Sequence, residues 1–118
     1  MSTLRVNTLQ NAAGTGQPAM SGAAKAWVNF NGTGVVAIRA SFNVTSITDG
    51  GTGLYTVNFT NALEDANYSV VLGVDNGGVS ATGNLYNNSL TTNNFKIFTL
   101  TSTPAVVDLP VVCASVFR

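Results

Sequence analysis

Strict alternation of apolar and polar side chains in short segments is the feature that most limits the folds open to this sequence. Between residues 54 and 60, aromatic and aliphatic side chains alternate with Thr and Asn. Because successive side chains of a β-strand point to opposite faces, such a segment has one buried face and one solvated face. Similar segments recur about every ten residues, without the pattern of a longer helix. An antiparallel sandwich or barrel would explain this, and we expect an all-β, antiparallel β-sandwich of about seven to eight strands.

Turn-forming residues separate the expected strands. The segment Asn31–Gly34 tolerates positive φ angles, so residues 24–30 and 35–46 are expected to form a hairpin. Asn61 and Glu64 have the spacing of a capping box, which predicts a single helical turn at a corner. The other expected strands are 54–60, 67–74, 79–86, 95–101 and 109–117.

The chain is expected to divide into an arm and a folded domain. Near the N-terminus Leu4, Val6 and Leu9 stand among polar residues, and a run of small, flexible residues follows them. A lone short strand cannot bury these side chains against itself, so they need a surface elsewhere. We expect residues 1–23 to be an attachment arm with its linker and residues 24–118 to be the sandwich. The alternative is a frayed terminus.

The sequence has few charged residues, which limits the classes of partner that this chain can bind. Charged residues make up 8% of the sequence and the net charge is zero, against about 25% charged residues in ordinary soluble proteins. The bases are scattered, so we expect no binding to nucleic acid. No apolar run is long enough to span a membrane, and the N-terminus lacks the layout of a secretory signal. Weak charge repulsion between copies favours self-association.

Residues that support catalysis are scarce. The sequence has no histidine, which excludes imidazole bases and ligands. Asp49 and Asp75 lie in glycine turns, Glu64 and Asp65 lie in the corner, and Asp108 precedes a Leu-Pro pair. Nothing indicates the two matched carboxyl groups of a glycoside hydrolase, and the glycine and lysine pattern of a P-loop is absent. We therefore expect no enzymatic activity, no cofactor and no metal.

A polar loop between the last strands is the best candidate for a binding site. Neutral sugars are held by an aromatic face together with amide and hydroxyl groups, and residues 84–94 are rich in all three. The alternative is that this Asn-rich loop is a solvated turn. The expected ligand-binding residues are Asn84, Tyr86, Asn87, Asn88, Asn93 and Asn94.

Three aromatic side chains are candidates for contacts between subunits. Trp27 points away from the face that its neighbours on the first strand share, so it either fills a second packed layer or meets another subunit. Tyr55 and Tyr68 are expected in the core or at a subunit interface, with their hydroxyl groups hydrogen-bonded.

Arg39 and Cys113 both lie within segments that are otherwise mostly apolar. Arg39 would be costly to bury without a partner, so we expect either an ion pair between subunits, with Asp65 or Glu64, or a solvated position on the outer face. Cys113 is the only cysteine, which excludes a disulfide within the chain. Its place in an alternating segment predicts a small, buried apolar residue.

Five blocks of sequence carry a resemblance to a known group of proteins. They are Ser2–Asn11 (STLRVNTLQN), Ala26–Gly32 (AWVNFNG), Ile38–Val44 (IRASFNV), Tyr55–Ala62 (YTVNFTNA) and Asp65–Tyr68 (DANY). In this order they resemble the C-terminal module of tail fibres and related virion appendages of tailed phages, notably those of marine bacteria and cyanobacteria.

The resemblance implies a β-rich virion component that assembles as a homotrimer. It also implies an arm held by another virion protein and a surface that contacts a polysaccharide or protein of the host envelope. Long fibres place shaft domains before this module, whereas here the module begins close to Met1. The alternative is therefore a structural protein that decorates the capsid or baseplate and binds no receptor.

Overall fold

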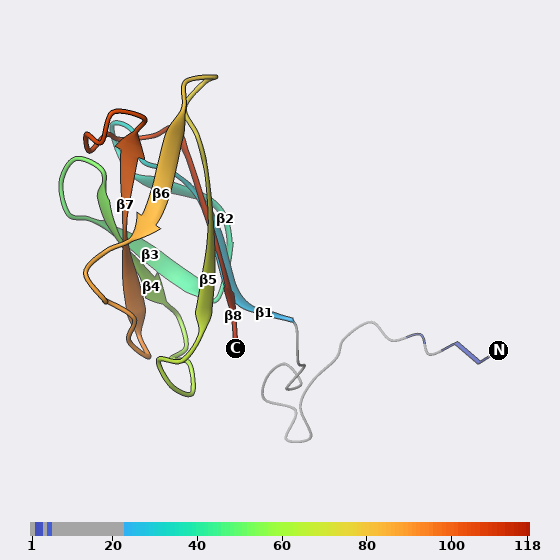
Figure 1. The fold of residues 1–118 in the computed structure, drawn as a ribbon. Coiled ribbons are helices and arrows are strands. Elements are labelled where there is room, and N and C mark those ends of the chain that lie inside the picture. Colours follow the sequence, from blue (N-terminus) through green and yellow to red (C-terminus); the bar gives the residue numbers. More distant parts are fainter. Residues whose placement is uncertain (1, 4, 6–22) are drawn as a thin grey trace.

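The structure is a computed structural model that describes residues 2, 3, 5 and 23–118, and these form eight strands in two antiparallel sheets (Figure 1). The predicted all-β sandwich is confirmed. The first sheet contains, in spatial order, β2 (Ala37–Phe42), β1 (Ala24–Asn31), β8 (Val111–Phe117) and β5 (Ser69–Asp75). The second sheet contains β3 (Val44–Asp49), β4 (Leu54–Phe59), β7 (Asn94–Thr101) and β6 (Ala81–Leu85). The expected anchoring residues Leu4, Val6 and Leu9 lie outside the described residues.

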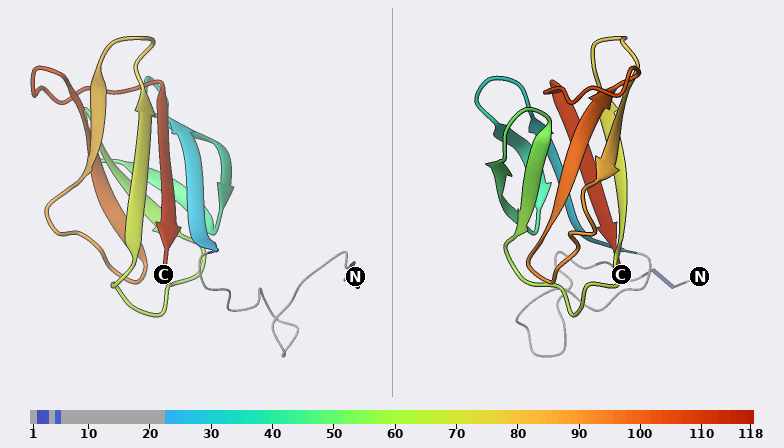
Figure 2. Two further views of the ribbon diagram at one scale, coloured as in Figure 1. Left: turned by 45° about the vertical axis from the view of Figure 1, so that its right-hand side comes forward. Right: turned by 60° about the vertical axis from the view of Figure 1, so that its left-hand side comes forward.

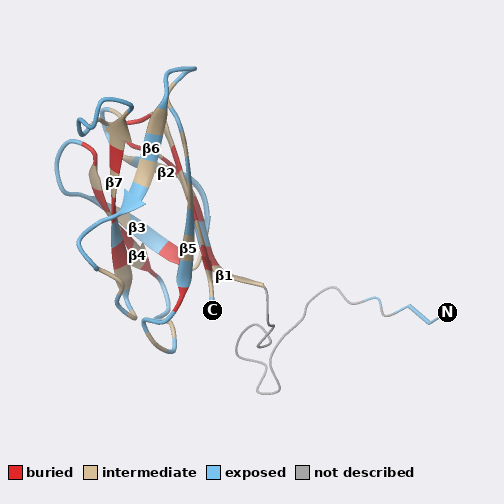
Figure 3. Ribbon diagram, in the orientation of Figure 1, coloured by how far each residue is buried: buried red, intermediate tan, exposed pale blue. Residues whose placement is uncertain are grey.

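The core lies between the inner faces of the two sheets (Figures 2 and 3). Burial alternates along the central strands β1, β4, β7 and β8, as the period of the sequence predicts. This confirms the expected inner faces of the first strand and of residues 54–60. The largest side chains that are fully buried are Phe30, Tyr55, Phe95, Ile97 and Leu109.

Asn43 moves the chain from one sheet to the other. The expectation of a single strand over residues 35–46 is wrong, because β2 ends at Phe42 and β3 begins at Val44 in the opposite sheet. Asn43 has φ 55°, a left-handed conformation that Asn tolerates better than most residues. Its side-chain amide donates to Lys25 O at 3.2 Å and Asn61 O at 3.1 Å, and its Oδ1 accepts from Asn61 N at 2.8 Å. The side chain thus joins segments of both sheets at the bend.

The corner between β4 and β5 contains no helical turn. The capping box expected at Asn61 and Glu64 does not form, because Asn61 N is already bound by Asn43. Instead, Asp65 Oδ1 accepts from Asn67 N at 2.8 Å and from Arg118 Nε at 2.9 Å. These hydrogen bonds from Arg118 and Asn67 lower the pKa of Asp65 to about 2.

Tyr55 closes the end of the sandwich opposite the C-terminus. Its hydroxyl oxygen lies 2.8 Å from Asp108 Oδ1 and 3.0 Å from Gly32 O, and Gly53 N donates to the same carboxylate oxygen at 2.7 Å. Burial and the hydrogen bond with Asp108 raise the pKa of Tyr55 above its ordinary value. Tyr55 is fully buried, so the structure favours the core over the expected subunit interface. The hydrogen-bonded hydroxyl is as predicted.

Candidate ligand-binding pocket

An open pocket of about 420 Å³ lies on the outer face of the second sheet, beyond the end of β6. Figure 1 shows the loop that borders it as it leaves β6 and returns to the start of β7. The pocket is lined by Tyr86, Asn87, Ser89, Thr91, Asn94 and Lys96. Its volume falls in the range of about 300–1,000 Å³ that small-molecule sites occupy.

The structure brings together half of the residues that we expected to bind a ligand. Tyr86, Asn87 and Asn94 line the pocket, whereas Asn84, Asn88 and Asn93 do not. Asn84 belongs to β6, where its side-chain amide lies 3.3 Å from Thr82 Oγ1.

Strand pairing places Tyr86 beside Lys96. The amide of Tyr86 donates to Lys96 O at 2.9 Å and so extends the β6 ladder by one step. The tyrosine ring packs edge-on against Phe98, with centroids 5.8 Å apart and an angle of 78°. Tyr86 remains 39% exposed. The ring is therefore held from one side and open to a ligand.

The loop turns back sharply after Tyr86. Asn87 and Asn88 have φ angles of 53° and 48°, and this pair of left-handed residues reverses the chain. Ser89 then fastens the loop to β7, because its hydroxyl oxygen accepts from Lys96 N at 2.8 Å. Asn88 thus has a conformational role that the composition of the loop did not reveal.

Thr91 organises the last part of the loop. Its hydroxyl oxygen accepts from Asn93 N at 3.2 Å and Asn94 N at 3.0 Å, and its backbone amide donates to Asn94 O at 2.9 Å. These bonds form a compact turn that leads into β7. Loop residues that hold each other in this way lose little conformational entropy when a ligand binds.

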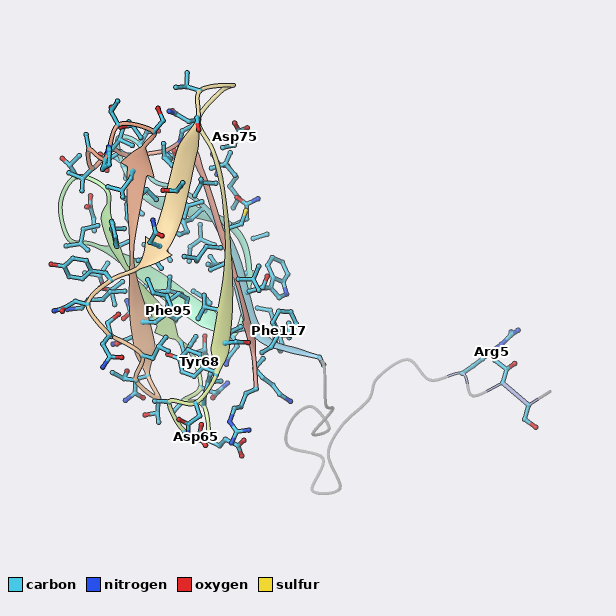
Figure 4. The ribbon with its side chains drawn as sticks, viewed as in Figure 1. Arg5, Asp65, Tyr68, Asp75, Phe95 and Phe117 are labelled. Atoms are coloured by element: carbon cyan, nitrogen blue, oxygen red, sulfur yellow. The ribbon has the colours of Figure 1, made fainter. Side chains whose placement is uncertain are left out.

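Tyr68 supports this turn from the core. Its hydroxyl oxygen lies 2.8 Å from Thr91 O and 3.1 Å from Asn94 O, so its proton can be donated to either carbonyl. Figure 4 shows Tyr68 and Phe95 pointing into the space between the sheets. Tyr68 is 5% exposed, so of the two expected positions, core or subunit interface, the structure favours the core. Burial raises its pKa to about 12.

Alkaline pH should therefore lower the free energy of unfolding of the domain. Tyr68 has an ordinary pKa of 10.0 and a folded pKa of about 12. Its contribution is complete below pH 10 and is lost as the pH rises from 10 through 12. Tyr68→Phe should cost about 1 kcal/mol at pH 7 and weaken the loss of stability above pH 10. Urea unfolding at a series of pH values measures both, and an unchanged alkaline slope would contradict the role of Tyr68.

The outer face of the first sheet carries an uncharged row of side chains. Strand pairing aligns Phe42, Trp27, Ser115 and Val71 across its four strands. Trp27 is 39% and Val71 is 60% exposed. Trp27 therefore lies outside the core. Its exposed side chain is available for the expected contact with another subunit.

Arg39 and its expected acidic partners are engaged with different groups. Arg39 occupies the solvated alternative, and its guanidinium donates to Asn29 Oδ1 at 3.3 Å and Pro110 O at 2.6 Å. Its expected partners Asp65 and Glu64 pair with Arg118, at 2.8 and 3.2 Å.

Cys113 lies on the outer face of β8. The expectation of full burial is wrong, because its neighbours Val112 and Ala114 take the inward positions and leave Cys113 half-buried.

No protein-family model, curated protein or solved structure matches this chain. Within the described residues, no helix has the length and apolar character needed to cross a membrane. The same part of the chain has no group of three or more acidic, Cys or His side chains that could hold a metal ion.

Ser89, Thr91 and Lys96 line the pocket although they are not among the six expected residues, and Lys96 lies outside the expected segment 84–94 altogether. Its position between the buried Phe95 and Ile97 does indicate an outward side chain. Its neighbour across the strands, however, depends on the register of β6 against β7, which the local pattern does not specify.

Proposed function

We propose that this chain is a non-enzymatic structural protein of a tailed-phage virion, a tail fibre or fibre-tip domain that contacts a glycan on the host cell. The observation that carries the proposal is the pocket beside Tyr86. It combines an exposed aromatic ring with amide and hydroxyl groups, on a loop that backbone hydrogen bonds hold in place. This is the set of groups that grips the C–H patches and hydroxyl groups of a sugar.

The positions of the acidic residues support binding without catalysis. Asp49 and Asp75 accept from the amides of their own turns, at 3.0 and 2.8 Å. Glu64 and Asp65 pair with Arg118, and Asp108 serves the network at Tyr55. None of the five lines the pocket, where a glycoside hydrolase needs two facing carboxyl groups.

A homotrimer is part of the proposal. The row that contains Trp27 and Val71 on the first sheet is uncharged and partly apolar, and burying the exposed parts of these two side chains against a second subunit is favourable. The arm, residues 1–23, is proposed to attach the trimer to another virion protein. Three copies of a weak pocket bind a repetitive polysaccharide more tightly than one copy does.

Binding of the purified chain to host cells tests this function. Light scattering at low micromolar concentration should give about three chain masses. Fluorescently labelled protein should adhere to cells of the bacterium that the phage infects, and soluble envelope polysaccharide from that bacterium should displace it. A chain that is monomeric and does not adhere to these cells would contradict the proposal.

The second candidate is a protein that decorates the capsid or baseplate without binding a receptor. The uncharged row across Phe42, Trp27, Ser115 and Val71 favours it equally, because another virion protein could pack against that row. Such a protein should bind purified heads or baseplates, and envelope polysaccharide should have no effect on this binding.

A further inference from the structure

The positive charge of the Lys96 ammonium group has no role in the binding of a neutral sugar. In residues 23–118 this ammonium group forms no ion pair, whereas Arg118 is paired with two carboxylates. Arg39 also has acceptors, on Asn29 and Pro110. Lys96 is exposed and lines the pocket with Tyr86. A lone ammonium group beside an aromatic ring gives this pocket a charge preference.

The surface around Lys96 is polar but uncharged. In the sheet, Lys96 lies opposite Thr56, which in turn lies opposite Thr48. One step along β4, the amide of Asn58 donates to Thr48 Oγ1 at 2.9 Å and to Ser46 Oγ at 3.1 Å. The hydroxyl groups of Thr48 and Ser46 are thus already engaged with a neutral donor, and no carboxylate lines the pocket to repel an anion.

We propose that the pocket takes an acidic sugar, a uronic acid unit of a bacterial polysaccharide. The inference rests on the proposed function and names the ligand class of the same site. Lys96 pairs with the carboxylate, and Tyr86 covers the C–H face of the ring. The side chains of Asn87, Thr91 and Asn94 supply hydrogen bonds for the ring hydroxyl groups.

The charge of the pocket favours a carboxylate over a phosphate or sulfate-rich ligand. Phosphate carries up to two charges and is usually held by several donors, such as an Arg fork or a nest of backbone amides. The pocket offers one ammonium group and no arginine. One carboxylate matches one lysine without leaving uncompensated charge.

An NMR titration of the isotope-labelled full chain tests the inference. The probes are hexasaccharides of galacturonate and of mannuronate, each with its fully methyl-esterified counterpart, which has the same ring but no charge. We expect at least one of the two acids to shift the amide signals of residues 86–96. Its ester should bind at least tenfold more weakly, and binding of the acid should weaken as salt is raised.

Two charge variants separate the pocket from the net charge of the protein. Lys96→Gln should weaken binding of the acid at least tenfold, while Lys96→Arg should retain most of it. Lys25→Gln removes the same charge from β1 in the other sheet, and it should leave binding unchanged. A dispersed spectrum for each variant shows that the domain still folds.

The outcomes distinguish the two proposals. Equal binding of acid and ester, or an unaltered affinity in Lys96→Gln, would overturn the acidic ligand and leave a glycan-binding pocket in place. If neither acid shifts the pocket signals, the acidic ligand is also overturned, and adhesion to host cells then decides the proposed function alone. Shifts confined to another surface would overturn the pocket for both proposals.

Discussion

Gly53→Ala should lower the free energy of unfolding by about 2–5 kcal/mol. A Cβ atom at this position would lie 2.8 Å from Val107 N and 2.9 Å from Thr99 O, both of which are backbone atoms. Neither atom can move without breaking the bonds Thr99 N to Gly53 O, 2.8 Å, and Val107 N to Thr99 O, 3.1 Å. Overpacking of this kind costs about 1–3 kcal/mol, and the left-handed φ of 66° adds about 1–2 kcal/mol for a residue with a side chain.

Gly34→Ala is the matched control for the close contact. Gly34 has nearly the same φ, 59°, but a Cβ atom there would meet nothing within 4 Å. Its substitution should cost only the conformational part, about 1–2 kcal/mol. Urea unfolding of both variants measures the difference, and equal losses would show that the approach of the β7–β8 connection to Gly53 contributes nothing.

Phe95→Ala should destabilise the domain by about 3–5 kcal/mol, because it removes a fully buried aromatic ring from the centre of the core. The ring centroid of Phe95 lies 5.7 Å from that of Phe59 and 6.3 Å from that of Tyr68. These are normal separations for interacting rings. The cavity would therefore be lined by Phe59 of β4, in the same sheet, and by Tyr68, which directly precedes β5 of the opposite sheet.

Phe98→Ala provides the comparison on the same strand. Phe98 lies on the outer face of β7, is half-buried and contacts the ring of Tyr86. Its loss should cost less than half as much stability as the loss of Phe95, since less apolar surface returns to water. Thermal and urea unfolding give both values. If Phe98→Ala proved as harmful as Phe95→Ala, the assignment of the inner face of β7 would be wrong.

The core and the pocket share structural elements. Phe95 contacts the ring of Tyr68, whose hydroxyl group binds the turn at Thr91 and Asn94. Lys96 follows Phe95 directly on β7 and points to the opposite face. The same strand therefore fills the interior with one side and presents the pocket with the other. A rigid sheet of this kind positions a site more accurately than a free loop does.

Several parts of the fold and site follow from the sequence alone. The period of two residues identifies the inner faces of β1 and β4, because alternation is a property of each strand by itself. The turns at Asp49 and Asp75 follow from the local chemistry of Asp and Gly, and both aspartates do accept from their own turns. The loop after β6 was identified from its amides and its tyrosine, and three of its six expected residues line the pocket.

Other parts depend on contacts between distant segments. Residues 35–46 look like one strand, but Asn43 bends the chain because its side chain binds Lys25 and Asn61, and no local pattern encodes these partners. The hydrogen bond that satisfies the Tyr55 hydroxyl group likewise depends on Asp108, which is far away in the sequence.

The site shows the same division between local and long-range information. Local alternation determines that Lys96 points outward, whereas the pairing of β6 with β7 decides that Tyr86 lies beside it. Conformation within a strand is set by neighbouring residues, while the register between strands is set by the energy of packing the whole sandwich. The sequence thus determined the faces of the regularly alternating strands β1 and β4, and only the tertiary structure decided which residues meet across the sheets.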